Sequence, residues 1–187
     1  MMRIGLVRHF PVTEPWPSGW VTSDDLQRWR IRYDAAEPII GPINVSAVQW
    51  QRCLSSDLKR AFVTAKAAFA GAIIQTPLLR EADVPALPTG NLRLPVWGWR
   101  LLLRFAWFTG HKSQRVERDE FRARIKAVAD LLEQEPVDTL VVSHAGVMFF
   151  LRKELLRRSF RGPKFKVAET ARLHLFRREQ GMAGPQD

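Results

Sequence analysis

The chain has 187 residues, a length that suits one α/β domain with its own core and is short for two. An apolar fraction of 46% is ordinary for a globular protein and argues against a disordered or coiled-coil chain. The single cysteine, Cys53, excludes a disulfide within the chain, and its apolar surroundings predict a buried side chain. We therefore expect a single domain over residues 1–187.

The formal net charge of +10 favours an anionic partner, either a phosphorylated molecule, nucleic acid or an acidic membrane surface. Much of this charge lies between Arg152 and Arg178, where a solvated helix face and a loop would also account for it. No zinc-finger spacing, aromatic RNA-binding signature or helix-turn-helix pattern accompanies it, so nucleic-acid binding has no support. No secretory signal is visible, and cleaving a leader would remove residues 8 and 9, so we expect a cytoplasmic location.

The first half of the chain predicts three short strands and two helices. The strands are apolar runs at 3–7, at 48–55 (broken by Ser55-Ser56) and at 72–76. A first helix is expected around residues 23–33, with Ser23 as its N-cap and two aspartates in its first turn. A second helix is expected at about 57–70, capped by Ser56, because apolar residues recur there at helical spacing.

The second half predicts an amphipathic helix at 119–134, a buried strand at 138–143, a helix from Gly146 to about Arg158 and a last strand at 167–176. Strands thus alternate with helices along the whole chain. This order predicts a three-layer α/β/α sandwich around a mainly parallel, doubly wound sheet.

Polar side chains collect just beyond the carboxyl ends of three predicted strands. They are Arg8 and His9 after strand 3–7, Ser55, Ser56 and Arg60 after strand 48–55, and His144 after strand 138–143. In a parallel sheet these ends share one edge, where open α/β folds bind ligands. Guanidinium groups bind phosphate oxygens, and a neutral imidazole can attack phosphorus. Each residue alone also has a structural explanation, but their coincidence at one edge predicts a phosphoryl site.

Four segments resemble motifs of the histidine phosphatase superfamily, which also contains cofactor-dependent phosphoglycerate mutases. They are Leu6-Val7-Arg8-His9, the stretch from Ser55 to Ala65, Leu79-Arg80-Glu81-Ala82-Asp83, and the stretch from Val142 to Val147. Any one of them is weak evidence, but four in the family's order are specific. The resemblance implies a phosphoglycerate mutase-like fold and a phosphatase that hydrolyses a phosphomonoester through phosphohistidine, with neither metal nor cofactor.

The resemblance also implies roles for individual residues. His9 would attack phosphorus, while Arg8, Arg60 and His144 surround the phosphoryl oxygens and stabilise their charge in the transition state. Ser56 would join the two arginines and His144 in binding the substrate.

Glu81 would protonate the leaving oxygen and then activate water, with Asp83 as the reserve candidate. The alternative for Glu81 is a solvated loop carboxylate. The chain departs from the family at Phe10, where glycine is usual, and a ring there would narrow the backbone options or form an apolar wall for the substrate. Val12 stands where threonine is frequent, and a Gly-Glu-Ser motif before the helix at 119–134 is missing.

Residues 94–110 form an aromatic segment that carries only Arg100 and Arg104 as charges. The segment is too short and too charged for a good transmembrane span. We interpret it as a helix over the active-site edge, packed on the domain or on a second subunit in a homodimer. The alternative is an interfacial helix that contacts a membrane or a lipid phosphate.

These observations predict a histidine phosphatase that acts on a phosphorylated small molecule of unspecified identity. Because no His and Asp residues show metal-ligand spacing, activity should persist in EDTA. Two alternatives stay open. A phosphoglycerate mutase shares the chemistry, although such chains are typically longer, and a non-catalytic basic module would bind anionic lipid or nucleic acid.

Overall fold

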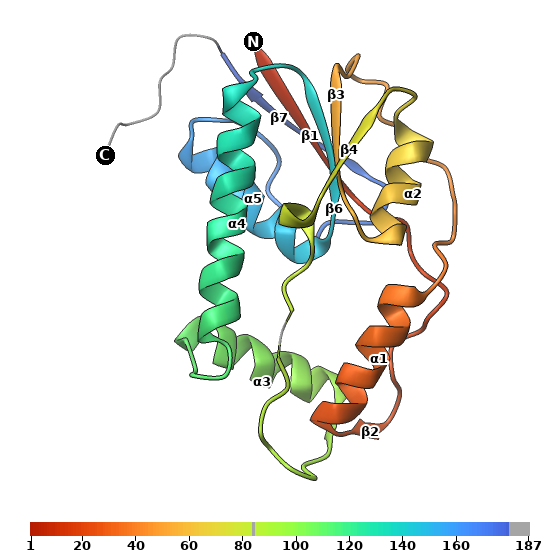
Figure 1. Cartoon of the computed structure of the whole chain (residues 1–187), viewed down its shortest axis with the longest axis vertical. Helices are drawn as coiled ribbons and strands as arrows, with labels where there is room; N and C mark the ends of the chain where they lie inside the picture. Colours follow the sequence, from red (N-terminus) through yellow and green to blue (C-terminus); the bar gives the residue numbers. More distant parts are fainter. Residues whose placement is uncertain (84, 180–187) are drawn as a thin grey trace.

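A computed structural model describes residues 1–83 and 85–179, and its centre is a five-stranded sheet (Figure 1). The strands, in spatial order, are β4 (Ile73–Thr76), β3 (Arg52–Ser56), β6 (Thr139–Ser143), β1 (Met2–Arg8) and β7 (Leu173–Arg178). The first four are parallel, and β7 runs antiparallel to β1. The predicted mainly parallel sheet is confirmed.

Helices cover both faces of this sheet. They are α2 (Lys59–Ala68) on one face and α4 (Arg115–Gln134) and α5 (Ala145–Arg157) on the other, with a short 3-10 helix, η1 (Pro77–Leu79), after β4. Successive strand residues point to opposite faces. Leu6 and Val141 therefore pack in the cluster with α4 and α5, whereas Val7 and Val142 pack against α2. The predicted three-layer sandwich is confirmed.

Cys53 lies in the core on the α2 side of the sheet and has no exposed surface. Burial raises the pKa of its thiol to about 12, so the side chain stays protonated at neutral pH. It is a small apolar core residue, as its sequence context predicts.

A second region, which we call the accessory lobe, lies beyond the carboxyl end of β1 (Figure 1). It consists of β2 (Trp20–Val21), α1 (Ser23–Ala35), β5 (Leu94–Pro95) and α3 (Val96–Thr109). Its own small core contains Val21, Leu87 and Trp99, and the Trp99 indole N–H donates to the carbonyl of Val21 at 2.7 Å. A single cooperative domain over residues 1–187 stays a prediction.

The helix α1 begins one residue earlier than the N-cap prediction implies. Thr22, and not Ser23, is the N-cap: its hydroxyl accepts from the amide of Asp25 at 3.2 Å, and the Asp25 carboxylate accepts from the amide of Thr22 at 2.9 Å. Ser23 is buried instead, and its hydroxyl accepts from the amide of Leu87 at 3.0 Å. Either hydroxyl suits a cap, so the tertiary contact with Leu87 decides between them.

The strand β3 begins at Arg52 instead of residue 48 and continues through the two serines that we expected to break it. Ser55 and Ser56 pair with β4. The Ser55 hydroxyl donates to the carbonyl of Ser56 at 2.8 Å, so this buried hydroxyl has a hydrogen-bond partner. Ser56 is not the cap of α2, whose N-cap position is Leu58; its hydroxyl accepts from the amide of Leu58 at 3.3 Å.

Other element ends differ by a few residues. The helix α4 starts at Arg115 instead of residue 119, and β7 covers Leu173–Arg178 instead of 167–176. Arg8 also pairs with Thr170 in an isolated β-bridge, and Thr170 lies three positions before the first residue of β7. Within residues 1–83 and 85–179, no helix combines the length and apolar character needed to cross a bilayer.

Candidate active site

Three motifs far apart in the sequence meet at the carboxyl edge of the parallel strands. β6 lies between β1 and β3, so His144, which directly follows β6, lies between the strand ends at Arg8 of β1 and Ser56 of β3. The amide of His9 donates to the carbonyl of Ser143 at 2.9 Å, and the rings of His9 and His144 lie 5.0 Å apart. The convergence expected from the strand ends is seen in the structure.

His9 is 2% exposed, and its hydrogen bonds define which ring nitrogen is free to react. Nδ1 lies 2.5 Å from the carbonyl oxygen of Phe10, and a carbonyl only accepts, so Nδ1 carries the proton. Nε2 therefore holds a lone pair, which accepts from Nε of Arg60 at 3.3 Å. Burial, together with the positive charges of Arg60 and Arg8, lowers the pKa of His9 to about 3. At neutral pH His9 is a neutral imidazole with its lone pair on Nε2.

One ring nitrogen of His144 has no partner among the described residues, the buried Nδ1. The other, Nε2, lies 3.0 Å from the Ser56 hydroxyl, which accepts from the amide of Leu58 and has its own proton to donate. In the tautomer in which Ser56 donates to Nε2, Nδ1 carries the hydrogen of the neutral ring. Burial, followed by the neighbouring His9 and the charges of nearby arginines, holds the pKa of His144 well below its usual value. An unpartnered buried donor of this kind is suited to an anionic oxygen.

The two arginines flank this histidine pair. Arg8 donates through Nη1 to the carbonyl of Ala168 at 3.0 Å, while its buried Nε has no partner among the described residues. Arg60 is 3% exposed, and its Nη1 pairs with the Asp34 carboxylate at 2.8 Å. Its guanidinium also lies 4.9 Å from the centre of the Tyr33 ring. The edge therefore combines two cations with two neutral imidazoles.

Phe10 contributes to the site through its backbone. Its ring is 1% exposed and packs inside the protein, so it is not an open apolar wall for a substrate. Its carbonyl orients His9, and its amide donates to the hydroxyl of Thr64 at 2.8 Å. Thr64 in turn donates to the carbonyl of Arg60 at 2.7 Å, which ties the residue after His9 to the helix that carries Arg60.

Glu81 reaches the same edge through the start of α5. One carboxylate oxygen accepts from the amide of Gly146 at 2.9 Å, two residues beyond His144, and the other from the amide of Ala82 at 3.2 Å. A β-carbon on Gly146 would overlap the Glu81 carboxylate where it now lies, so glycine leaves room for this close approach. Asp83 is 72% exposed on its side chain, and its carboxylate pairs with Arg30 at 2.8 Å.

Sequence reasoning missed one face of α1. Arg30, Tyr33 and Asp34 lie three and four positions apart and so share a side of the helix. Asp34 pairs with Arg60, the Tyr33 ring lies 6.4 Å from that of His9, and the charge of Arg30 contributes to the lowered pKa of His144. The polar spacing was visible in the sequence, but nothing there indicated which part of the sheet this face would meet.

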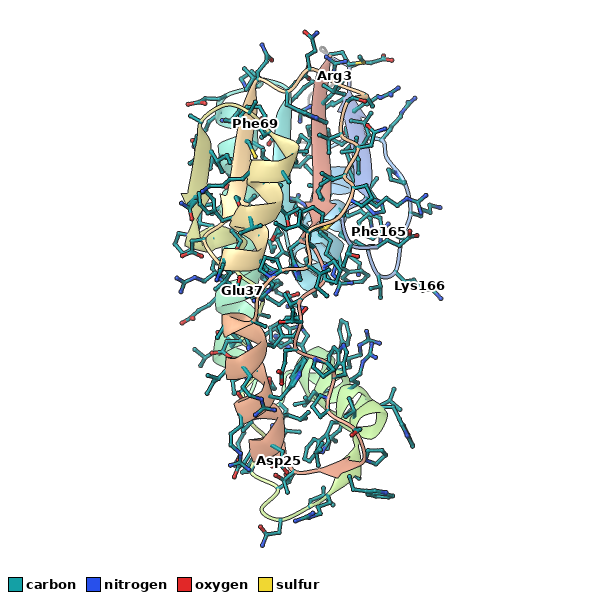
Figure 2. All side chains as sticks on the ribbon, turned by 90° about the vertical axis from the view of Figure 1, so that its right-hand side faces the viewer. Arg3, Asp25, Glu37, Phe69, Phe165 and Lys166 are labelled. Atoms are coloured by element: carbon teal, nitrogen blue, oxygen red, sulfur yellow. The ribbon has the colours of Figure 1, made fainter. Side chains whose placement is uncertain are left out.

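Figure 2 shows how α1 reaches the site. Asp25, at its beginning, lies at the far end of the accessory lobe, and Glu37, just beyond its end, lies where the lobe meets α2. Lys59, the first residue of α2, forms an ion pair with Glu37 at this junction. The last turns of α1 therefore border the carboxyl edge of the sheet.

Among the described residues, no three His, Cys, Asp or Glu side chains gather in a way that would hold a metal ion. The polar groups at the edge are mainly cations and neutral donors, the set that suits a phosphoryl dianion.

The chain is thus an α/β sandwich with a mostly parallel sheet, and two arginines and two histidines gather at the carboxyl edge of that sheet. The family model of the histidine phosphatase superfamily (branch 1) matches residues 43–183, which include Arg60, Glu81 and His144. The chain belongs to this superfamily. Arg8 and His9 lie before the matched stretch, and their place beside the other motifs comes from the pairing of β1 with β6.

Two solved structures share the fold. The alpha-ribazole phosphatase from Shigella flexneri is 17% identical over 99% of this chain and 95% of its own, with a TM-score of 0.56. Bacillus stearothermophilus YhfR is 19% identical over 97% of this chain and 93% of its own, with a TM-score of 0.52. At these identities the likeness shows the fold alone. A search of curated protein sequences finds no match.

Proposed function

We propose that the chain is a phosphomonoester hydrolase in which Nε2 of His9 forms a phosphohistidine. The observation that carries this proposal is the state of His9: a buried, neutral imidazole whose Nδ1 proton is held by the Phe10 carbonyl and whose Nε2 lone pair faces the site. Such a nucleophile needs no base to activate it at neutral pH. Membership of the histidine phosphatase superfamily and the fold shared with a phosphatase support the same conclusion.

In the first step, the Nε2 lone pair attacks phosphorus, and the bond from phosphorus to the ester oxygen breaks. The leaving oxygen takes a proton from Glu81 in its acid form, and the substrate departs as an alcohol. Arg8, Arg60 and Nδ1–H of His144 stabilise the charge on the phosphoryl oxygens. Arg60 must release its hydrogen bond to His9 Nε2 as phosphorus approaches, and the phosphoryl oxygens offer it a replacement partner.

In the second step, the Glu81 carboxylate takes a proton from water, and the resulting hydroxide attacks the phosphohistidine. The bond from phosphorus to Nε2 breaks, which frees inorganic phosphate and restores the neutral ring. Because the two steps use Glu81 in opposite protonation states, each turnover leaves this carboxyl ready for the next. The substrate is a phosphorylated small molecule, and no group at the edge requires a metal ion for these steps.

The test is a rapid quench with a radiolabelled phosphomonoester. We expect acid-labile, base-stable label on wild-type protein, and neither label nor turnover with His9→Ala. His111→Ala is the matched control, because His111 is exposed and lies outside the site. Label and turnover that survive in His9→Ala would overturn the mechanism.

The same assay separates the alternatives. EDTA should leave the rate unchanged, and loss of activity that a divalent metal restores would contradict the metal-independent mechanism. Release of inorganic phosphate distinguishes a hydrolase from a mutase, which would instead return the phosphoryl group to an isomer of 3-phosphoglycerate. A protein that binds phosphate but never becomes labelled would be the non-catalytic module.

A further inference from the structure

The helix α3 has two apolar faces, and the protein covers only one of them. Trp99, Ala106 and Trp107 are buried against the lobe and the sheet core. The opposite face carries an exposed row at helical spacing: Trp97 (68% exposed), Leu101 (60%), Phe105 (68%) and Phe108 (58%). Figure 2 shows α3 on the outer side of the lobe. Large apolar side chains concentrated in this way mark an interaction surface.

The exposed row borders an open surface groove of about 700 Å³. Trp20 from β2, Pro95 from β5 and Trp97, Leu101 and Phe105 from α3 contribute to its lining, which is almost entirely apolar. Trp20 is itself 67% exposed. We call the exposed row and this groove together the α3 face.

The segment that carries α3 is basic. Residues 85–116 contain no Asp or Glu, and they contain five basic residues, all exposed: Arg93, Arg100, Arg104, Lys112 and Arg115. The whole chain carries a formal charge of +10. A segment with tryptophans on an exposed apolar face, five cations and no acids has the composition of a helix that lies in the interface of an anionic membrane.

A second copy of the chain fits this face less well. In a symmetric dimer the same patch meets itself, so Arg100 and Arg104 would approach the same arginines of the other copy, with no acidic residue on this segment to offset them. Anionic lipid headgroups supply the missing negative charge, and the acyl region accepts the aromatic rings. At 14 residues, α3 is suited to lying on the bilayer and too short to cross it.

We propose that the α3 face binds the surface of a bilayer that contains anionic phospholipids. The proposal is independent of the phosphatase chemistry, because none of these side chains touches His9, Arg60 or His144 in the described contacts. Membrane docking would hold the neighbouring active site close to phosphorylated compounds at that surface.

The experiment is co-sedimentation of the whole chain with vesicles of phosphatidylcholine alone or mixed with phosphatidylglycerol. We expect binding to the mixed vesicles, little to phosphatidylcholine alone, and weakening as salt rises, because charge attraction is screened. Tryptophan emission should shift to shorter wavelength on binding as indole rings leave water. Equal binding to both vesicle types, or none to either, would overturn the proposal.

Substitutions on the α3 face test which side chains contact the vesicle. Phe105→Ser and Leu101→Ser should each weaken binding about tenfold, the scale of losing one buried large apolar side chain. Ile40→Ser is the matched control, because Ile40 is also 68% exposed but lies in the loop after α1, and it should bind like wild type. Arg104→Glu should weaken binding more than Lys126→Glu, which makes the same charge change on an exposed position of α4. Unchanged binding by Phe105→Ser and Arg104→Glu would exclude this face.

Two readouts separate this proposal from its rivals. Hydrolysis of p-nitrophenyl phosphate by Phe105→Ser should stay at the wild-type rate, so a failure of membrane binding is distinct from a failure of catalysis. Sedimentation velocity should show a monomer without vesicles. A dimer that Phe105→Ser dissociates, together with no binding to vesicles, would assign the face to self-association and overturn the proposal.

Discussion

The carboxyl edge of the sheet and the accessory lobe lie side by side, yet they leave different kinds of atoms unpartnered. At the edge, Arg8 Nε and His144 Nδ1 are buried polar atoms with no partner among the described residues. On the lobe, Trp97 and Phe105 are apolar side chains left in water. An anion would provide a hydrogen-bond partner for the polar atoms at the edge, and an apolar or interfacial environment would remove the rings of the lobe from water.

The two regions also depend on different forces. A chain of hydrogen bonds from Phe10 through Thr64 to Arg60 orders the edge. Replacing one side-chain atom at the edge changes the charge of the site or the position of a proton in it. The lobe depends on a small apolar core around Trp99. We therefore expect substitutions at the edge to change chemistry with little loss of stability, and substitutions in the lobe core to do the reverse.

After the complete loss expected from His9→Ala, the largest effect at the edge is expected from Glu81→Gln. Gln keeps the size of the side chain but cannot exchange a proton, so alkyl phosphates should lose roughly 10²–10⁴-fold in the phosphorylation step. An aryl phosphate with a low-pKa leaving group needs little protonation and should lose far less. It should also show a burst followed by slow turnover, because water attack needs the base.

Pre-steady-state rates on both esters provide the measurement, with Asp83→Asn as the control. Asp83 pairs with Arg30 at the surface, and its amide variant should show no such selectivity. If Asp83→Asn instead spares only the aryl ester, the acid is Asp83 and the assignment of Glu81 is wrong.

Arg60→Ala should slow the reaction by about 10²–10³-fold, the scale of removing one preorganised charge-stabilising donor. The helix α2 should persist, since alanine is a good helix former. The rate with p-nitrophenyl phosphate and the melting temperature are measured together. Arg28→Ala removes an exposed arginine whose partner, Asp25, lies at the far end of the lobe, and it should leave the rate unchanged. A loss below tenfold would mean that Arg60 only positions its neighbours.

Trp99→Ala tests how far the stability of the accessory lobe depends on its own core. Removing this fully buried ring should cost about 3–5 kcal/mol of packing, lost mainly from the lobe. Hydrogen exchange should then show faster opening of amides in α1 and α3, while amides in β1 and β6 keep their protection. Trp97→Ala, on the exposed face of the same helix, is the matched control and should alter neither set. Equal loss of protection everywhere would show that lobe and sheet unfold as one unit, the single domain that the sequence predicts.

Acid stability should also depend on the neutral state of His9. The pKa of His9 is lowered to about 3 in the folded protein, so between pH 3 and its ordinary value of about 6.5 only the unfolded chain binds this proton. The free energy of unfolding should therefore fall as the pH falls through this range, by about 1.4 kcal/mol per pH unit for His9. His9→Asn should remove that part of the slope in denaturant titrations, and the exposed His111→Asn should not. Identical slopes for the two variants would show that His9 is not held neutral by the fold.

Local sequence patterns were sufficient for the sheet and for the main groups at its edge. Apolar runs such as 3–7 and 138–143 have the length and composition of buried strands, and in a parallel sheet the residues that follow them meet at one edge. Arg8, His9 and His144 could therefore be placed together without knowing any contact. The same reasoning could not choose between Thr22 and Ser23 as a cap, because both hydroxyls satisfy the local requirement equally.

The tertiary structure alone decided the features that depend on where one element faces another. The side of α1 that carries Tyr33 and Asp34 became part of the site because the lobe folds back onto the strand ends. The proton position on His9 follows from the Phe10 carbonyl, and His144 meets the Ser56 hydroxyl 88 residues away only in the folded chain. The sequence of α3 is apolar nearly all round, so only packing determined which face was buried and which remained exposed.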